Sequence, residues 1–219
     1  SPSDARRRCE RPCCAANQPG GERMNVETLQ TTQGTTIAGP LLITPRAFGD
    51  DRGWFFESWN QTRFNEAVGQ TVEFSQDNHS RSIQGVLRGL HYQLAPEPQA
   101  KLVRSSVGSV FDVAIDIRQT SPTFGQWVGA VLSAENKAQL WIPEGFAHGF
   151  LTLSAVAEVQ YKARGFWNKT CERALRWDDP TLGIDWPQGE LNGNTISLSP
   201  KDAESPDFLS AKASGDLFP

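Results

Sequence analysis

The chain has 219 residues, a formal net charge of −4 and a pI near 5.4, and its 38% hydrophobic and 21% charged residues are ordinary for a globular protein. This acidic balance argues against a nucleic-acid-binding surface, which usually needs a basic patch. No apolar run approaches the roughly 18 residues needed to span a bilayer, so we expect no nucleic-acid or membrane partner and a cytoplasmic location.

The first 23 residues differ from the rest of the chain. They are rich in Arg, Pro and Gly, lack a periodic apolar pattern, and hold Cys9, Cys13 and Cys14. This spacing resembles neither a zinc ligand set nor a disulfide framework. We therefore expect residues 1–23 to be a disordered extension and residues 24–219 to form a single domain, in which the remaining Cys171 is a buried bystander.

One helix is predicted near the start of that domain. Asn60 can cap residues 61–68, the apolar face includes Phe64 and Val68, and Gly69 can end the helix.

Short strands and turns account for most of the remaining sequence. Residues 78–81 are polar and indicate a turn. In 107–117 apolar residues alternate with Asp112 and Asp116, as in a strand with one buried face. Further strands are predicted at 101–104, 127–132, 138–142, 149–153 and 157–162. Turns every 8–12 residues or so are typical of an antiparallel sandwich or barrel, onto which we expect the loop-like sequence after about 168 to pack.

Several catalytic motifs are missing from the sequence. It contains no GxGxxG, GxxxxGK[ST], GxSxG or HExxH. The histidines, His79, His91 and His148, lack the closely spaced pair of a metal-holding cupin sandwich, although they could still converge on a metal. The paired acids at 50–51 and 178–179 could suggest a glycosidase, but their Gly and Pro neighbours predict turns. We therefore predict no metal and no cofactor.

Polar residues gather around His91 in the strand-like segment VLRGLHYQ. Arg88 precedes His91 by three positions and Gln93 follows by two, so His91 and Gln93 share a strand face. A histidine that titrates near neutrality and has a carboxylate partner is the usual general base.

Three other residue types suit proton transfer but fit structural roles equally well. His148 lies in IPEGFAHGF, where two glycines allow a tight turn that would present its imidazole. The Tyr161 hydroxyl could deliver a proton to a carbanion, or lie satisfied in the core. Lys101 and Arg104 could be ordinary charges at a strand end.

Taken in order, these segments resemble the dTDP-4-dehydrorhamnose 3,5-epimerase family. The resemblance runs from Met24 nearly to the C-terminus and includes RAFGDDRGWFFESWN, FSQDNHSRS, GVLRGLHYQ, KLVRSSVGSVFDVAIDIR, SPTFGQWVG, LSAENKAQLWIPEGFAHGFL and RWDDPTLGIDWP. It implies a mainly β, double-stranded β-helix jelly roll of the RmlC-like cupin type, with a few short helices and no metal. It also implies a homodimer that exchanges N-terminal strands.

The implied activity is an isomerase that epimerises C3 and C5 of dTDP-4-dehydro-6-deoxy-D-glucose to dTDP-4-dehydro-β-L-rhamnose, by proton abstraction beside the C4 ketone. Carried over to this sequence, His91 is the base, Asp202 pairs with it, Lys101 faces the C4 oxygen, and Tyr161 returns a proton at C5. Arg88 binds the diphosphate. The other implied substrate-binding positions are Arg52, which reaches across from the partner subunit, Phe55, Glu57, Gln76, Asn78, His148, and Trp167, where the family often has a tyrosine.

Narrower or different functions stay open at this point. Within the family, the alternatives are a single-site 3- or 5-epimerase and a 3,4-ketoisomerase, and the presence of both His91 and Tyr161 favours the double epimerase. Outside it, the alternatives are a non-catalytic sugar-nucleotide-binding cupin, since a fold does not fix a function, and a metal-dependent cupin oxygenase.

Overall fold

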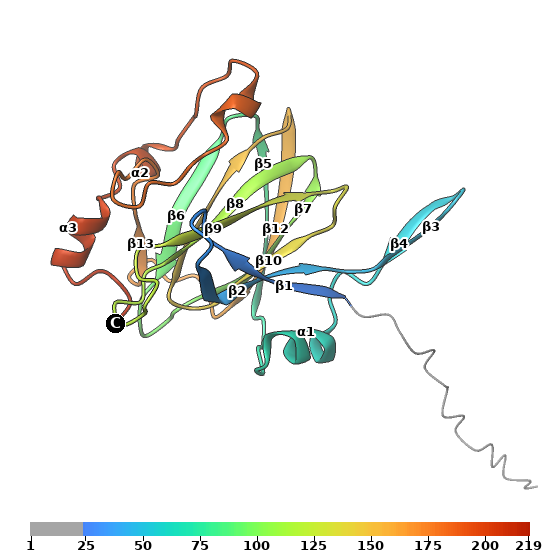
Figure 1. Ribbon diagram of the computed structural model, residues 1–219, viewed down its shortest axis with the longest axis horizontal. Coiled ribbons are helices and arrows are strands. Elements are labelled where there is room, and N and C mark those ends of the chain that lie inside the picture. Colours follow the sequence, from blue (N-terminus) through green and yellow to red (C-terminus); the bar gives the residue numbers. More distant parts are fainter. Residues whose placement is uncertain (1–23) are drawn as a thin grey trace, which may run out of the picture.

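The computed structural model describes residues 24–219, so the predicted disorder of residues 1–23 and the three cysteines there lie outside the described residues. Two sheets of antiparallel strand pairs face each other (Figure 1). One contains β1 (Asn25–Gln30), β2 (Thr36–Thr44), β5 (Gln76–Ile83), β7 (Ala100–Val107), β10 (Gln139–Ile142) and β12 (Val156–Arg164). The other contains β6 (Leu87–Gln93), β8 (Ser109–Asp116), β9 (Trp127–Ser133), β11 (Phe146–Thr152) and β13 (Glu172–Ala174).

The strand orders are β1-β2-β10-β7-β12-β5 and β13-β6-β11-β8-β9. Neighbouring strands therefore come from distant parts of the sequence, and the chain crosses repeatedly between the two sheets. This is the predicted jelly roll.

Apolar side chains from both sheets fill the space between them. Val103 and Val159 of the six-stranded sheet meet Val110 and Phe150 of the five-stranded sheet in one buried cluster. Each such side chain contributes roughly 1.5–3 kcal/mol when it leaves water. The cluster therefore holds the two sheets together.

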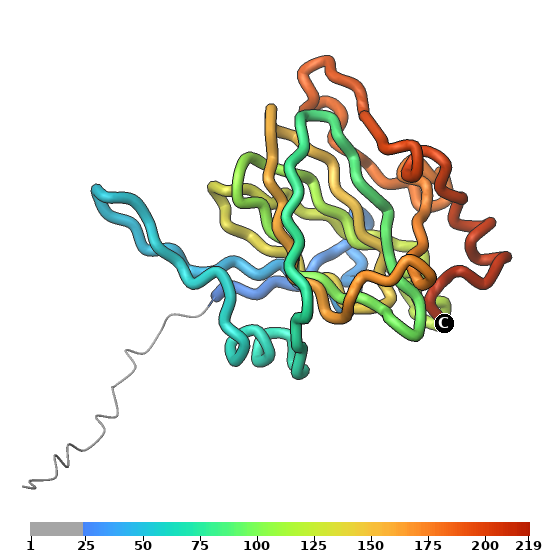
Figure 2. The backbone as a smooth tube through the Cα atoms, turned by 180° about the vertical axis from the view of Figure 1, so that it is seen from behind, coloured from blue at the N-terminus to red at the C-terminus, as the bar shows by residue number. Residues whose placement is uncertain are grey.

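The last third of the chain covers the outer face of the five-stranded sheet, as predicted. Val113 and Ile115 of β8 pack against Leu182, Trp186 and Phe208 of this segment. It contains the 3₁₀ helix η1 (Gln188–Leu191) and the short helices α2 (Pro200–Ala203) and α3 (Phe208–Ala213). Seen from behind, the C-terminal third runs along the outside of the sandwich (Figure 2).

A single helix, α1 (Gln61–Val68), covers part of the outer face of the six-stranded sheet. The Asn60 side chain accepts the Arg63 N–H at 3.2 Å, and Gly69 ends the helix in the left-handed region, at φ 70°. The ring of Phe64 packs edge-on against Trp141 of β10. This confirms the helix and both caps. No helix between residues 24 and 219 is long and apolar enough to cross a membrane.

Three sequence-based predictions were wrong for β5, β7 and β8. Residues 78–81 lie inside β5, not in a turn, because their polar side chains alternate between the inside and the outside of the sandwich. The predicted strand at 107–117 is two strands, since Gly108 turns the chain at φ 65°. The expectation of one exposed face on this strand was also wrong, because Asp112 and Asp116 are both fully buried.

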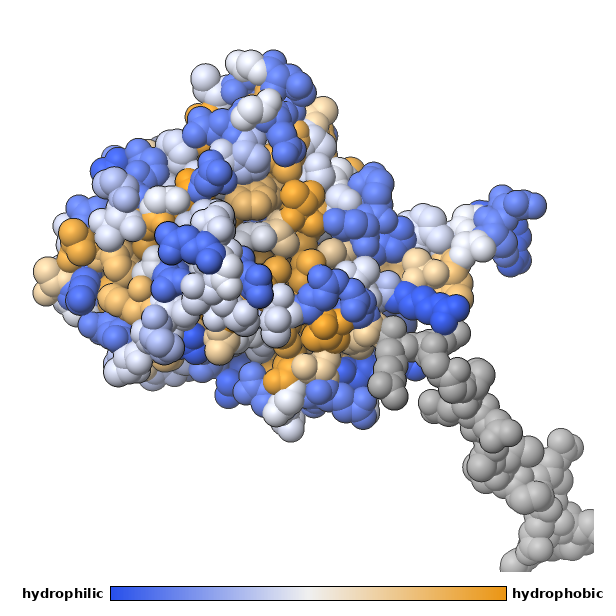
Figure 3. Space-filling model, viewed as in Figure 1, coloured by the Kyte–Doolittle hydropathy of each residue, from blue (hydrophilic) through white to orange (hydrophobic). Residues whose placement is uncertain are grey.

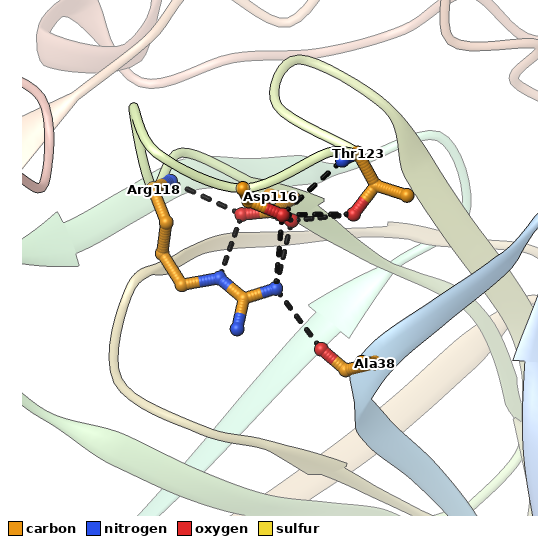
Figure 4. A network of polar contacts seen from close by, with 5 residues as sticks. Ala38, Asp116, Arg118 and Thr123 are labelled. Atoms are coloured by element: carbon orange, nitrogen blue, oxygen red, sulfur yellow. Dashed lines mark hydrogen bonds and ion pairs between the residues drawn. The ribbon is translucent and has the colours of Figure 1, made fainter.

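The Asp116 carboxylate binds a network of donors at one end of β8 (Figure 4). It accepts hydrogen bonds from Arg118 Nε at 2.9 Å, Ser121 Oγ at 2.5 Å and Thr123 Oγ1 at 2.7 Å. Arg118 Nη2 in turn donates to the Ala38 carbonyl of β2 at 3.0 Å. This network ties the end of β8 to the N-terminal strands.

A two-stranded arm, β3 (Ala47–Asp50) and β4 (Gly53–Phe56), projects from the body (Figure 1). Its hydrophilic tip stands clear of the other elements (Figure 3). At the tip Asp50 accepts the Arg52 N–H at 2.9 Å, which confirms the predicted turn. Trp54 and Phe55 are 63% and 71% exposed. The turn predicted at 178–179 is also present, where Asp179 accepts the backbone N–H of Thr181.

Candidate active site

A cavity of about 460 Å³ opens where the apolar filling between the sheets ends. It brings together six predicted residues, namely Arg88, His91, Lys101, His148, Tyr161 and Asp202. Its other lining residues are Ser80, Val86, Leu87, Phe150, Ser197, Leu198, Ser199 and Lys201. Three of the charged residues are cations and one, Asp202, is an anion, so the lining suits an anionic ligand.

His91 is held by a short hydrogen bond. Its Nε2 lies 2.6 Å from Oδ1 of Asp202, whose side chain is only 5% exposed. Burial acts to raise the pKa of Asp202, but the hydrogen bond and charge of His91 outweigh it and hold that pKa below 3.8. An ionised carboxylate only accepts, so Nε2 carries the proton and Nδ1 keeps the lone pair that a base needs.

Asp202 reaches His91 because a short helix presents it. Ser199 caps α2, and its hydroxyl accepts the Asp202 N–H at 3.1 Å. Pro200 occupies the first turn, where its missing N–H costs nothing. A negative side chain is also favoured in the first turn of a helix. The segment SPKD (residues 199–202) therefore holds the Asp202 carboxylate in place next to His91.

Two glycines let the strands under the site come together. A Cβ on Gly89 would lie 2.6 Å from the Gly149 Cα, and one on Gly149 would lie 2.8 Å from the Arg88 carbonyl oxygen. β6 and β11 can therefore pair closely, with His91 opposite His148. We predicted that Gly149 would shape a turn to present His148. That was wrong, since both residues lie within β11 and the turn is at Gly145.

Lys101 and Tyr161 lie on the opposite sheet from His91. Lys101 Nζ is 5.7 Å from the centre of the Tyr161 ring. Burial lowers the pKa of Lys101 from 10.5 to about 8, although nearby Asp112 and Glu172 oppose this. Burial raises the pKa of the Tyr161 phenol above 10.0. At neutral pH the cavity therefore holds an ammonium ion and a protonated phenol across from the imidazole.

His148 forms a second histidine–aspartate pair, inside the sandwich. Its Nε2 lies 2.9 Å from Oδ1 and 3.1 Å from Oδ2 of Asp112, and both side chains are buried. Burial lowers the pKa of His148 below 6.5, against the opposing charge of Asp112. The partner of His148 is thus a buried carboxylate.

The predicted binding residue Arg88 lies on the cavity wall, whereas Gln76 and Asn78 lie on β5 and Trp167 lies in the loop between β12 and β13. Arg88 Nε donates to Ser82 Oγ at 3.0 Å, which directs its exposed guanidinium along the wall. Gln76 donates to Asn78 at 3.0 Å and accepts the Trp167 backbone N–H at 3.1 Å. The Trp167 side chain is exposed. Its ring is therefore free to stack on a ligand.

Six predicted residues do not line this cavity, namely Gln76, Asn78 and Trp167, described above, and three in or beside the arm. Arg52 and Phe55 belong to the arm, where the Arg52 guanidinium pairs with Asp50. Glu57 follows the arm and binds Asn60 and Arg63 beside helix α1. None of the three lines the cavity that contains His91.

The sequence reasoning missed several residues of the site. Lys201 lines the cavity and pairs with Glu172 of β13 at 2.6 Å. Asp112 was assigned to an exposed face, yet it contacts His148. An aspartate inside an apolar strand, beside the small residue Ala114, was the available signal for Asp112. Lys201 stands directly before Asp202 in the matched segment and could have been inferred with it.

The third histidine lies elsewhere. His79 Nε2 is 2.9 Å from Glu158 on the outer face of the six-stranded sheet, where it lines a separate cavity of about 320 Å³ with Trp59 and Arg104. Each histidine thus has its own carboxylate. Between residues 24 and 219 no group of three or more His, Cys, Asp or Glu side chains is placed to hold a metal.

This geometry suits proton transfer on a ligand held between the two sheets. A base on one sheet faces an acid on the other, as inversion at a carbon requires. The buried Lys101 ammonium, beside Tyr161, can stabilise a developing oxyanion. Arg88 and Lys201 offer cationic contacts for phosphate groups.

Known proteins resemble this chain over most of its length. Residues 34–210 match the family model described as dTDP-4-dehydrorhamnose 3,5-epimerase. A Shigella flexneri dTDP-4-dehydrorhamnose 3,5-epimerase is 58% identical over 178 residues, which cover 81% of this chain and 95% of that protein.

Solved structures agree with this match. An RmlC epimerase from Legionella pneumophila, in complex with dTDP-4-keto-L-rhamnose, is 47% identical with a TM-score of 0.79 over 89% of this chain and 98% of its own. A 3'-monoepimerase from Streptomyces bikiniensis, in complex with dTDP-quinovose, is 31% identical with a TM-score of 0.75 over 82% and 88%.

Proposed function

The chain belongs to the dTDP-4-dehydrorhamnose 3,5-epimerase family of RmlC-like cupins and epimerises C3 and C5 of dTDP-4-dehydro-6-deoxy-D-glucose, and we propose that His91 and Tyr161 carry the proton transfers. The product is dTDP-4-dehydro-β-L-rhamnose. The observation that carries the proposal is the cavity itself, in which His91–Asp202, Lys101 and Tyr161 converge from two facing sheets.

His91 is the base. Its Nδ1 removes the proton from C5, and in a separate turn from C3, since both carbons adjoin the C4 ketone. Asp202 fixes the imidazole by accepting from Nε2 and stabilises the imidazolium that forms. A positioned base of this kind contributes roughly 10²–10⁴-fold to the rate.

Lys101 stabilises the enolate, and Tyr161 protonates it at C5. Loss of a proton beside the ketone places negative charge on the C4 oxygen, and an ammonium in a buried cavity lowers the energy of that charge. Tyr161 then protonates C5 from the sheet opposite His91. A phenol whose pKa is raised by burial is protonated at neutral pH and can donate.

The remaining residues hold the nucleotide. Arg88 is at the cavity wall, where a guanidinium can bind diphosphate oxygens in a bidentate way. Gln76, Asn78 and His148 contact the sugar and its neighbours. Trp167 stacks on the thymine, for which its exposed indole offers a flat surface.

A second copy of the chain completes the site. The arm projects from its own body with Phe55 exposed, and Arg52 and Glu57 lie outside their own cavity. We propose a homodimer in which N-terminal strands are exchanged and the arm brings these residues to the partner's cavity. β2 pairs with β10 through three residues only, Leu41, Leu42 and Ile43, so this edge is suited to exchange. The nucleotide-sugar substrate favours a cytoplasmic location.

Solvent exchange tests the proton transfers. Proton NMR of the substrate, incubated with the enzyme in deuterated water, should show deuterium at both C3 and C5. His91→Asn should abolish exchange at both carbons. His79→Asn is the matched control, because His79 lies on the outer face, and it should exchange like the wild type.

Other outcomes have distinct meanings. Exchange at one carbon only would make the enzyme a single-site epimerase, the activity named for the Streptomyces bikiniensis protein. Exchange that survives in His91→Asn would refute the assignment of the base. No exchange in the wild type would overturn the enolate mechanism for this substrate.

Mixing two inactive variants tests the role of the partner subunit. If Arg52 serves the partner's cavity, co-refolded Arg52→Ala and His91→Asn chains form heterodimers with one intact site, and about a quarter of the wild-type activity should return in a symmetric dimer. If Arg52 serves its own chain, the mixture stays inactive.

A further inference from the structure

The buried carboxylate of Asp112 has a role that neither the base nor the acid accounts for. Asp112 lies in the middle of β8 and is fully buried. His148 Nε2 is 2.9 Å from Oδ1, but its hydrogen bond is directed to Oδ2 at 3.1 Å. Oδ1 is therefore buried without an aligned donor. An unsatisfied charged oxygen costs several kcal/mol in a protein interior, so its retention calls for an explanation.

The position of Asp112 supplies one. Alternation along β8 puts Asp112 on the same face as Val110 and Ala114, which belong to the cluster between the two sheets. Its partner His148 lines the active cavity together with Lys101. The carboxylate therefore lies directly behind the wall of the cavity, on the sheet that faces Lys101.

Lys101 needs a counter-charge at this place. It is 9% exposed, and the charged form of a buried lysine is disfavoured. Of the groups that retain its charge, Asp112 is the strongest and Glu172 is next. The other titratable or charged groups around the cavity are His148 on β11, His91 and Arg88 on β6, Tyr161 on β12, and Lys201 and Asp202 on α2.

We propose that Asp112 is a positioning residue of this reaction, whose buried carboxylate orients His148 and supplies the negative charge behind the cavity wall that faces the Lys101 ammonium. The inference rests on the proposed function, because it assumes that Lys101 stabilises the enolate. Without the charge of Asp112, Lys101 would be neutral over part of the physiological range. A neutral amine gives the enolate oxygen much weaker stabilisation.

The pH profile of C5 exchange tests this inference. In the wild type the alkaline limb should follow the Lys101 pKa of about 8. Asp112→Asn keeps the shape of the side chain and removes its charge, so the limb should move down by about one pH unit. The resulting deficit should be roughly fivefold at pH 8 and should narrow to below twofold at pH 6.5.

Asp116→Asn is the matched control. Asp116 is equally buried on the same strand, but its partners are Arg118, Ser121 and Thr123. Its alkaline limb should coincide with that of the wild type. An equal shift in both variants would overturn the inference, as would an Asp112→Asn deficit that is the same at every pH.

A second variant decides the matter if Asp112→Asn does not fold. His148→Asn leaves the Asp112 charge in place with one partner fewer, so the alkaline limb should stay or move up. A downward shift would refute the role of Asp112. A wild type that shows no exchange at any pH would instead overturn the proposed function, so the two failures are distinguishable.

Discussion

Two positions on β8 place the same side chain in opposite environments. Asp116 is surrounded by donors, from Arg118, Ser121 and Thr123, and its pKa falls below 3.8 because these bonds outweigh the opposing effect of burial. Asp112, four positions earlier and equally buried, has one histidine and an oxygen without an aligned donor. A fully satisfied buried charge holds elements together, whereas an incompletely satisfied one retains energy that a reaction can use.

The largest effect should come from the active cavity. Tyr161→Phe removes the proposed acid and should slow product formation at C5 by roughly 10²–10⁴-fold. Deuterium exchange catalysed by His91 should persist at C3, since that step does not use the phenol. Stability should change little, and thermal unfolding would check this. Equal loss at both carbons would contradict the assignment of Tyr161 to C5.

Substitution of Asp116 should show the reverse pattern, with a loss of stability and an unchanged rate. Asp116→Asn should lower the free energy of unfolding by about 2–3 kcal/mol, less than a fully buried pair because Arg118 is 29% exposed. The rate of C5 exchange should stay as in the wild type. Urea unfolding measures the first quantity and NMR the second. A large loss of rate without loss of stability would contradict the structural role of Asp116.

Acid unfolding sharpens the same comparison. Since the folded-state pKa of Asp116 is lowered, its contribution to stability is complete above its unfolded pKa and is lost as the pH falls through the folded value. The stability difference between wild type and Asp116→Asn should therefore shrink below about pH 4. A difference that stays constant from pH 7 to pH 2 would show that Asp116 contributes by packing alone.

The smallest effect should come from a local feature far from either carboxylate. Asn60→Ala removes the cap of α1 and should cost about 1 kcal/mol of stability. Activity should be unchanged. A loss of activity with this variant would indicate that α1, which follows the arm, also fixes the arm's direction.

Rules that use only residues close together in the sequence correctly predicted the local elements of the fold. Helix α1, its caps and the strands after residue 100 follow from periodicity and from Asn and Gly at the right positions. The jelly roll and six of the residues that line the cavity followed from the family resemblance. The contact of His91 with Asp202 spans 111 positions, and no spacing rule could supply it.

The wrong predictions share a physical cause. Polarity was taken to mean exposure, so 78–81 became a turn and Asp112 an exposed residue. In this fold both faces of β8 are covered, by the opposite sheet and by the C-terminal segment. Polar residues inside such a strand must be paired or functional. Gly149 was also assigned to a turn, but it lies within β11, where its lack of a side chain lets β6 and β11 approach closely.

The distance between His91 and Asp202 along the chain has a consequence during synthesis. Ribosomes add about 5–20 residues per second, so the 111 positions that separate the pair correspond to roughly 5–20 s. The last strand, β13, ends at Ala174, so in the later part of this time the nascent polypeptide holds all of its described strands while the imidazole still lacks its carboxylate. Catalytic competence is therefore among the last properties that a newly made copy acquires, because a chain that ends before Asp202 lacks the carboxylate that orients the base.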